Sequence, residues 1–382
     1  MSLDRASQEG EPASSPSFPT LPTPPQVPAN RLSGEETINS ILDLTDQVAS
    51  TALFGSIGVG KSFVALAIIH HKRTKVKFGR NRHFMRCDNP QNSPEAFLER
   101  LSGVIGIIRT TDIGQIRSYL ESSPPLILLL DGVDLILDPL APEAEDTFTT
   151  IEESSRYKHV CLLITSRTYP EISGFHRVEV PNFSESDARN AFYGLCNLGR
   201  SPVVDNLIAR LDFHPLSIEL LAAAVRDNGW DELTLLKVWD ELTFPKVWEG
   251  DKNGVLNAQY QRSLKDVVGR SFRLPTIRKL GTTAREALEA IATLPCGVEE
   301  CRLESTFPSI TGVEVAVDVL CKFSLLHRRD GFVKIISLFR FYFLATVQER
   351  RRRIKSVHWD TANCGAAEAS RSFSLHLVSL AG

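Results

Sequence analysis

Residues 55–62 read Gly55-Ser56-Ile57-Gly58-Val59-Gly60-Lys61-Ser62, which fits the pattern G-x-x-x-x-G-K-[ST] of a phosphate-binding loop. The glycines allow backbone N–H groups to turn inward around phosphate oxygens without a Cβ in the way. We expect Lys61 to place its ammonium on the β- and γ-phosphates, and Ser62 to bind Mg²⁺ through its hydroxyl. A helix that begins at this point would add the positive end of its dipole.

The sequence on either side provides the context that this motif requires. Thr51–Phe54 is a short run of strand-forming residues, and Ser62–His70 is rich in apolar residues, as in a buried helix. The alternative, a glycine-rich turn that contains a lysine by chance, requires neither a strand before it nor a helix after it. We therefore interpret residues 55–62 as a P-loop that binds ADP or ATP with Mg²⁺.

Strand and helix patterns alternate through the first half of the chain. Two strand candidates are continuous apolar runs, as expected for strands covered on both faces of a sheet. The candidates are Thr51–Phe54, Arg82–Cys87, Leu126–Leu130, His159–Thr165 and the weaker Phe175–Val180, which is an edge-strand candidate. Such alternation predicts an α/β fold, in which a parallel sheet carries helices on both faces. Past Pro181 the patterns are mostly helical.

Two polar residues follow the apolar strand candidates. Asp131 comes directly after Leu126–Leu130, where a carboxylate would hold Mg²⁺ through water. Gly132 stands where many ATPases have a second acid, so Asp134 would act as a base only if the turn brings it back. Arg167 follows the next strand, where a cation would contact a γ-phosphate. The alternatives are a strand-end turn residue for Asp131 and a surface arginine for Arg167.

Composition and charge narrow the class of protein. A chain of 382 residues allows two or three domains, and hydrophobic and charged fractions of 42% and 23% are typical of a soluble globular protein. A net charge of −3 gives no general attraction to nucleic acid or membranes. The scattered cysteines lack the paired spacing of a zinc site and indicate a reducing compartment. Without a secretory signal or a bilayer-length apolar segment, we expect a cytoplasmic protein.

These motifs resemble the NB-ARC/STAND class of signalling ATPases, and in particular the nucleotide-binding core of fungal NOD-like receptors. The resemblance rests on the P-loop, Leu-Leu-Leu-Asp at 128–131, Thr-Ser-Arg at 165–167 and Phe213-His214-Pro215-Leu216-Ser217-Ile218. It covers about residues 45–346. By this resemblance Pro215 would pack on the nucleotide base or ribose. Members of this class keep ADP clamped between domains, exchange it for ATP to open and self-associate, and hydrolyse ATP slowly as a reset.

Composition predicts the two tails of the chain, and the resemblance implies the helical and winged-helix-like domains between them. The expected order is a disordered Pro/Ser-rich tail (1–30), a P-loop domain (31–182), a small helical domain (183–250), a winged-helix-like domain (255–346) and a basic, poorly ordered tail (347–382). The Pro/Ser-rich composition of the first segment cannot bury enough apolar surface to order it. We expect nucleotide as the ligand, further copies of the chain as partners on activation, and no direct binding to nucleic acid or membranes.

One segment departs from the resemblance. Relatives often carry a Met-His-Asp motif whose histidine contacts the ADP phosphate, whereas Ile335-Ile336-Ser337 corresponds to it here. Two other functions therefore stay open: an AAA-like ATPase with steady turnover, and a degenerate module that keeps ADP only for structure. Gly132 and the lack of a basic stripe argue against the first, and the missing histidine favours the second.

Overall fold

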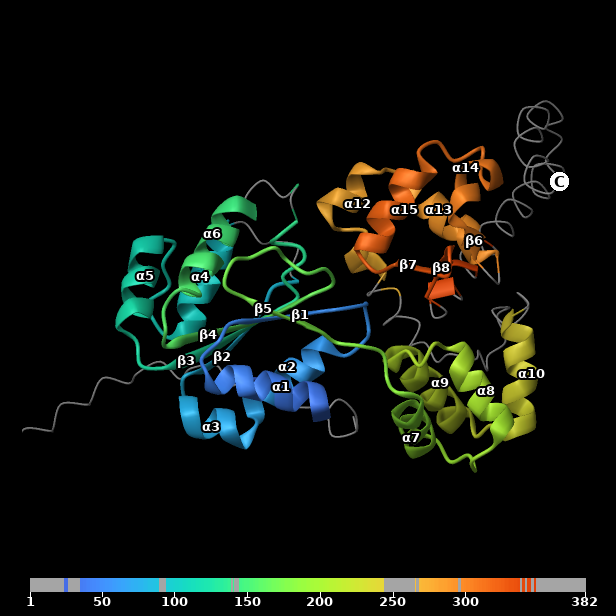
Figure 1. Ribbon diagram of the computed structural model, residues 1–382, viewed down its shortest axis with the longest axis horizontal. Coiled ribbons are helices and arrows are strands. Elements are labelled where there is room, and N and C mark those ends of the chain that lie inside the picture. Colours follow the sequence, from blue (N-terminus) through green and yellow to red (C-terminus); the bar gives the residue numbers. More distant parts are fainter. Residues whose placement is uncertain are drawn as a thin grey trace, which may run out of the picture.

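The computed structural model describes residues 24–26, 35–88, 94–138, 140, 144–243, 265, 268–294, 297–336, 339–340, 342–344 and 347. The segments predicted as tails, 1–30 and 347–382, lie outside these residues except for 24–26 and 347. Within the described ranges, no helix has both the length and the apolar character needed to cross a membrane. The elements form three groups, which Figure 1 shows as blue to green, green to yellow, and orange to red.

The first group, here called the sheet group, contains five parallel strands in the order β2-β3-β4-β1-β5. Every residue of β3 and β4 is buried, as predicted for strands covered on both faces. β5 lies at an edge, which agrees with its weaker pattern. The strands are β1 (Thr51–Phe54), β2 (Arg82–Arg86), β3 (Leu126–Asp131), β4 (Val160–Ser166) and β5 (His176–Glu179).

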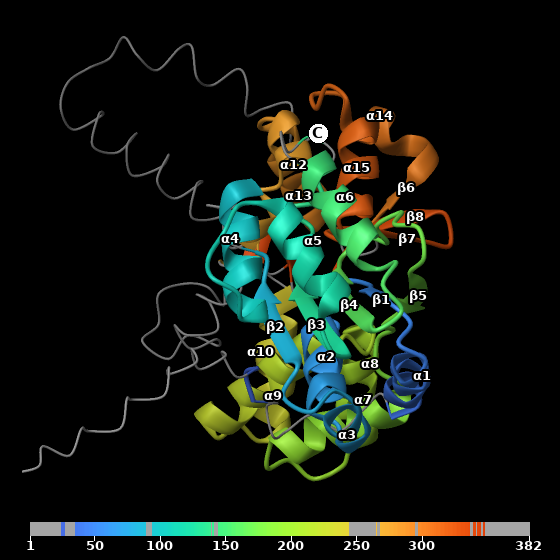
Figure 2. The ribbon, with the colours of Figure 1, turned by 90° about the vertical axis from the view of Figure 1, so that its left-hand side faces the viewer.

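Helices cover both faces of this sheet (Figures 1 and 2). Alternate residues of β3 point to opposite faces: Ile127 and Leu129 pack with α1, α2 and α3, whereas Leu128 and Leu130 pack with α4, α5 and α6. The predicted α/β fold is therefore confirmed. The helices are α1 (Glu35–Asp46), α2 (Lys61–His70), α3 (Lys72–Phe78), α4 (Pro94–Ile105), α5 (Ile113–Ser122) and α6 (Ala144–Ser154).

The second group, the helical group, follows β5. Ser184 caps its first helix by accepting a 3.1 Å hydrogen bond from the backbone N–H of Asp187. Phe192, Leu207, Leu221 and Leu235 come from its four helices and share one apolar cluster. The helices are α7 (Glu185–Leu195), α8 (Pro202–Arg210), α9 (Pro215–Asn228) and α10 (Glu232–Thr243).

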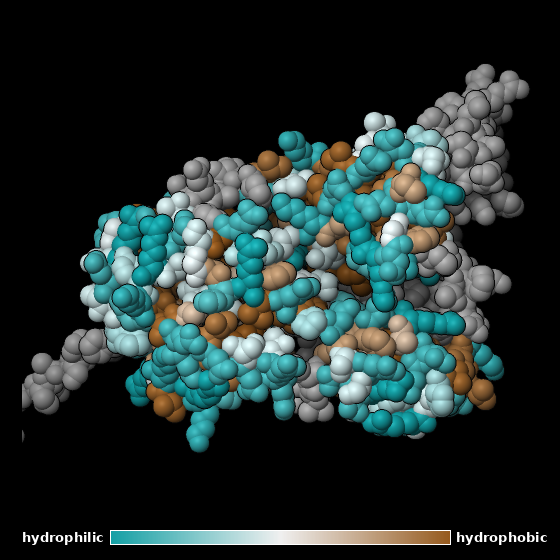
Figure 3. Space-filling view, in the orientation of Figure 1, coloured by the Kyte–Doolittle hydropathy of each residue, from teal (hydrophilic) through white to brown (hydrophobic). Residues whose placement is uncertain are grey.

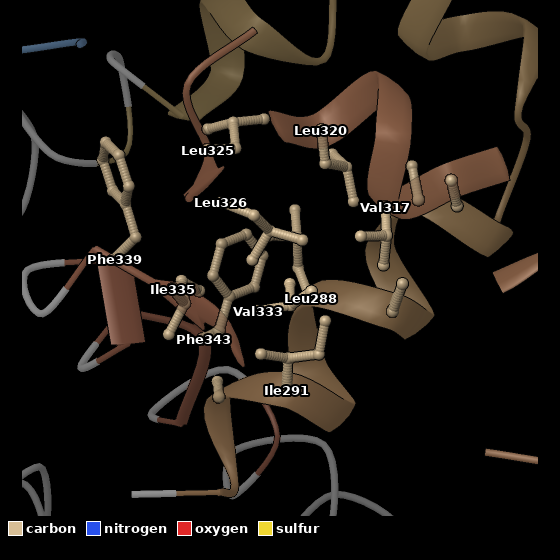
Figure 4. Packing of buried hydrophobic residues seen from close by; sticks show 14 of the residues in the cluster. Leu288, Ile291, Val317, Leu320, Leu325, Leu326, Val333, Ile335, Phe339 and Phe343 are labelled. Carbon is tan, nitrogen blue, oxygen red and sulfur yellow. The ribbon is translucent and has the colours of Figure 1, made fainter. Parts of the chain in front are cut away.

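The third group has a winged-helix-like arrangement of short helices and a three-stranded antiparallel sheet in the order β6-β8-β7. We call it the winged group, and it begins at residue 268. Leu288 of α13, Leu320 of α15 and Val333 of β8 converge in its core (Figure 4). The elements are α12 (Pro275–Lys279), α13 (Thr283–Ala292), β6 (Val298–Glu299), α14 (Leu303–Thr306), α15 (Val313–Lys322), β7 (Leu326–Arg329) and β8 (Phe332–Ile335).

Polar residues cover most of the face of the molecule seen in Figure 3. Among the described residues, the exposed large hydrophobic side chains are scattered over many elements rather than gathered in one patch. They are Val76, Ile108, Leu140, Val203, Leu233 and Val315. Isolated residues of this kind are normal on a protein surface and do not indicate a docking face.

Replacing Leu320 by alanine should destabilise the winged group. Leu320 is fully buried whereas Val315, on the same helix, is 60% exposed. We expect Leu320→Ala to lower the free energy of unfolding by about 2–5 kcal/mol, through lost burial and the cavity left behind. Val315→Ala, the matched control, should change it by less than about 0.5 kcal/mol. Urea unfolding measures the free energy of unfolding of both variants, and equal losses would show that this core is not packed as described.

Candidate functional site

The P-loop connects β1 to α2 at the carboxyl edge of the sheet. Gly55, Gly58 and Gly60 have φ angles of +146°, +80° and +104°, which residues with a Cβ rarely adopt. A Cβ on Gly58 would lie 2.7 Å from Cδ2 of Leu216, and one on Gly55 would lie 2.7 Å from a backbone oxygen of Val180. Both the path of the loop and its close neighbours therefore require glycine.

Lys61 turns back over this loop. Its Nζ donates hydrogen bonds to the carbonyl oxygens of Gly55 (2.8 Å) and Ser56 (2.9 Å). Burial lowers the pKa of Lys61 to about 8, while the nearby carboxylates Asp134 and Asp131 act in the opposite direction. Because a phosphate oxygen is a stronger acceptor for an ammonium than a neutral carbonyl, a phosphate in the loop would compete for this side chain.

Asp131 lies at the end of β3 and is only 5% exposed. Its Oδ1 accepts hydrogen bonds from the hydroxyls of Ser62 (2.6 Å) and Thr165 (2.7 Å), so α2, β3 and β4 meet at this atom. Carboxylate and hydroxyl oxygens are the hard ligands that Mg²⁺ prefers. Ser62 and Asp131, the two residues expected to hold the metal, therefore lie together and fit such an ion.

The turn after β3 brings Asp134 back to the end of β4. Asp134 Oδ1 accepts hydrogen bonds from the Ser166 hydroxyl (2.9 Å) and the backbone N–H of Arg167 (2.7 Å). The Arg167 side chain is 11% exposed, with Nε 3.9 Å from Asp134 Oδ2. Burial lowers the pKa of Arg167, and the charge of Asp134 opposes that shift. Arg167 is therefore a buried, paired arginine rather than a surface one.

Two cavities flank the P-loop. One, of about 310 Å³, is lined by Lys61, Ser62, Asp131, Asp134 and Arg167 together with residues of the winged group. The other, of about 510 Å³, is lined by Gly60, by residues at the start of α1 and by the segment that leads into α7. A phosphate chain running through the loop would join the two spaces, because Gly60 lines both.

The helical group contacts the P-loop through the start of α9. His214 is buried, and its Nε2 lies 2.9 Å from the carbonyl oxygen of Ile57. Leu216 packs against Gly58. Pro215 is buried between these two residues and lines neither of the two cavities. Its contact with a nucleotide base stays a prediction, whereas His214 and Leu216 are the residues of this motif that contact the loop.

The winged group also contacts the sheet group around the P-loop. Arg167 donates a 2.7 Å hydrogen bond from Nη1 to the Ser271 hydroxyl, and Arg270 forms an ion pair with Asp88. The Asp138 carboxylate, 1% exposed, accepts a 2.6 Å hydrogen bond from the hydroxyl of Thr276 at the start of α12. These polar contacts join two groups that are distant in the sequence.

An apolar contact accompanies them. Ile57 at the tip of the P-loop belongs to the same buried cluster as Leu288 and Leu320 of the winged group and Leu220 of α9. Ile336, which stands in place of the expected histidine, is buried and lines a third cavity with Gly55 and other residues of the loop and α15. The segment after β8 therefore does face the P-loop, with an apolar side chain.

Several residues of the site escaped the sequence analysis. Thr165 was noted only as part of Thr-Ser-Arg, and His214 only as a neighbour of Pro215. Arg270 and Arg273 lie in a segment that showed nothing beyond helical character. The only available signal was the pair of arginines three residues apart, which is too common to indicate a site.

Comparisons with known proteins find similarity at the level of the fold. No family model and no curated protein matches the sequence. The structure is similar to the Walker-type ATPase of Pyrococcus abyssi, with 13% identity and a TM-score of 0.56, over 84% of this chain and 98% of that one.

Two further solved structures are more distant. A STAND protein with a tetratricopeptide repeat sensor, from Pyrococcus horikoshii, has 13% identity and a TM-score of 0.37, over 84% of this chain and 43% of that one. The Orc1 protein of Aeropyrum pernix in complex with DNA has 12% identity and a TM-score of 0.41, over 86% and 96%. The NB-ARC resemblance itself rests on the sequence motifs alone. The chain thus has the fold of P-loop NTPases: a parallel five-stranded sheet with helices on both faces and a P-loop after its first strand.

Proposed function

We propose that this chain binds ADP or ATP with Mg²⁺ at the P-loop and acts as a nucleotide-controlled switch of the NB-ARC/STAND type. One observation carries the proposal: both of the other groups contact the loop that would hold the phosphates. His214 reaches Ile57, and Ile57 enters the core of the winged group. A ligand in this loop would act on both contacts directly.

Each residue of the motif has a role in this proposal. The backbone N–H groups of Gly58 and Gly60 would turn toward the phosphates, and Lys61 would leave the carbonyls of Gly55 and Ser56 to neutralise their charge. Ser62 and Asp131 would hold Mg²⁺, which supplies further positive charge next to the phosphates. Arg167 would contact the γ-phosphate with the guanidinium that now faces Asp134 and Ser271.

Switching requires that the two nucleotides stabilise different arrangements. A ligand shifts a conformational equilibrium only by its differential affinity for the two states. ADP and ATP differ at the γ-phosphate, and the contact of Arg167 with Ser271 lies where that phosphate would act. Drawing Arg167 toward phosphate would weaken its hold on the winged group. Opening would then expose surfaces for self-association, which is the finer part of the proposal.

Hydrolysis should be slow in this protein. Asp134 is the next acidic residue after Asp131 in the sequence, but its carboxylate already accepts hydrogen bonds from Ser166 and Arg167 and faces the Arg167 guanidinium. An AAA-like ATPase with steady turnover would need a carboxylate free to accept a proton. We therefore expect turnover well below about 1 s⁻¹, the lower end of typical enzyme rates.

A second candidate function is a degenerate module that holds ADP only for structure. The apolar Ile336 favours it, because a histidine at this position would have added a polar contact between the winged group and the nucleotide. In that case nucleotide would stabilise the chain without changing its shape.

Binding should depend on Lys61 and on its protonation. Lys61→Ala should weaken ADP binding roughly ten- to a hundredfold, because a charge-assisted contact contributes about 1.5–3 kcal/mol. Phosphate favours the charged ammonium, so the complex holds more protons than the free protein between pH 8 and the ordinary lysine pKa of 10.5. Affinity should fall as the pH rises through this range.

Calorimetric titration with ADP at pH 9, in buffers of different ionisation enthalpy, measures the proton uptake. Wild type should take up close to one proton and Lys61→Ala none. Lys72→Ala, an exposed lysine at the start of α3, is the matched control and should behave as wild type. Unchanged ADP affinity in Lys61→Ala would refute the assignment of the loop.

Exchange of nucleotide should change the shape of the molecule. Replacing ADP by Mg²⁺ and the non-hydrolysable analogue AMP-PNP should increase the radius of gyration in small-angle X-ray scattering, and should produce larger species in sedimentation velocity. A degenerate module would give the same shape with both nucleotides. A steady ATPase would instead turn over ATP many times per second without forming a persistent open species.

A further inference from the structure

The cavity beside Lys61 carries more positive charge than the P-loop motif accounts for. It is lined by five cationic side chains and three carboxylates, in a chain whose net charge is −3. The cations are Lys61, Arg86, Arg167, Arg270 and Arg273, and the carboxylates are Asp88, Asp131 and Asp134. The excess of two positive charges matches the charge of about −2 on a terminal phosphate group.

Two of these arginines come from outside the sheet group. Arg270 and Arg273 belong to the segment that precedes α12, in the winged group, which lies beside the end of the sheet near α4 (Figure 2). Arg270 Nη1 forms an ion pair with Oδ2 of Asp88, just beyond β2. Among the described residues, no hydrogen bond or ion pair involves the side chain of Arg273.

The ion pair of Arg270 is suited to exchange. Its two side chains are 42% and 27% exposed, so water screens the pair and it contributes little to stability. Asp88 also lies 3.4 Å from Nε of Arg86, which leaves it partly neutralised when Arg270 departs. A phosphate offers three strong acceptor oxygens to a guanidinium and can replace a single exposed carboxylate.

We infer that Arg270 and Arg273 bind the terminal phosphate of a nucleoside triphosphate, and that Asp88 holds Arg270 while that phosphate is absent. The inference rests on the proposed function and deepens it, because it names residues of the winged group that distinguish a triphosphate from a diphosphate. The first two phosphates of either nucleotide would lie at the side of this cavity formed by Gly60, Lys61 and Ser62, and the third phosphate would extend from there toward Arg270 and Arg273. Asp88 repels that phosphate and competes for Arg270, so it raises the ATP concentration that is needed for binding.

The test compares two nucleotides in four variants. Arg270→Gln and Arg273→Gln remove one charge each, and Asp88→Asn removes the competing carboxylate. Arg278→Gln is the matched control, because Arg278 is exposed on α12 and does not line the cavity. Calorimetry gives the affinity of each variant for ADP and for AMP-PNP in the presence of Mg²⁺.

Each of the Arg270 and Arg273 variants should lose about tenfold or more in affinity for AMP-PNP, with ADP affinity near that of wild type. Asp88→Asn should bind AMP-PNP more tightly than wild type, and Arg278→Gln should match wild type for both nucleotides. In wild type, AMP-PNP should slow hydrogen exchange at the backbone amides of residues 268–274 relative to ADP. Arg273→Gln should reduce that difference.

Two results would overturn the inference, and they differ in what else they refute. In the first, wild type binds both nucleotides while the arginine variants show the same ratio of AMP-PNP to ADP affinity as wild type. In that case the arginines do not bind the third phosphate. The proposed function would survive that result. If wild type binds neither nucleotide, the proposed function fails and this inference fails with it.

Discussion

A buried carboxylate at the end of β3 holds the candidate site together. Asp131 is only 5% exposed, and burying a charged carboxylate costs free energy unless hydrogen bonds compensate. The hydroxyls of Ser62 and Thr165 supply those bonds, from α2 and from β4. The Thr165 hydroxyl in turn accepts the backbone N–H of Gly132, which fixes the start of the turn that carries Asp134. The P-loop, the strand ends and the Asp134–Arg167 pair thus all depend on this one group.

Most elements of the sheet group could be predicted from the sequence, because the patterns that mark them are local. The five strand candidates correspond to the five strands of the sheet, although only two of them are continuous apolar runs. Asp131 and Arg167, which follow those two runs, lie at the carboxyl edge as expected. Three short helices, α3, α5 and α6, were not anticipated, since few apolar residues mark their buried sides. α5, for example, buries only Ile116 and Leu120. The contacts between the winged group and the sheet group could not be predicted, for a different reason. Asp88 and Arg270 are 182 positions apart, and no local pattern pairs them.

The P-loop in this molecule is a meeting point of three groups, and this is what distinguishes it from a loop that only holds a ligand. His214 contacts the Ile57 carbonyl from the helical group, and the Ile57 side chain lies in the apolar cluster of the winged group. Ile336 also faces the P-loop, but its side chain is apolar and forms no hydrogen bond there. In the proposed switch, polar communication with the winged group would therefore run through the arginine side of the site, by Arg167 and Ser271, rather than through the segment after β8.

Whether the P-loop holds a nucleotide can be decided from the nucleotide content of the purified protein. The protein would be denatured, and the released nucleotides separated by anion-exchange chromatography and quantified against the protein concentration. We expect about one nucleotide per chain, mainly ADP, because a closed loop with slow turnover retains its product. Protein that carries no nucleotide, and that fails to take up added ADP with Mg²⁺, would contradict it.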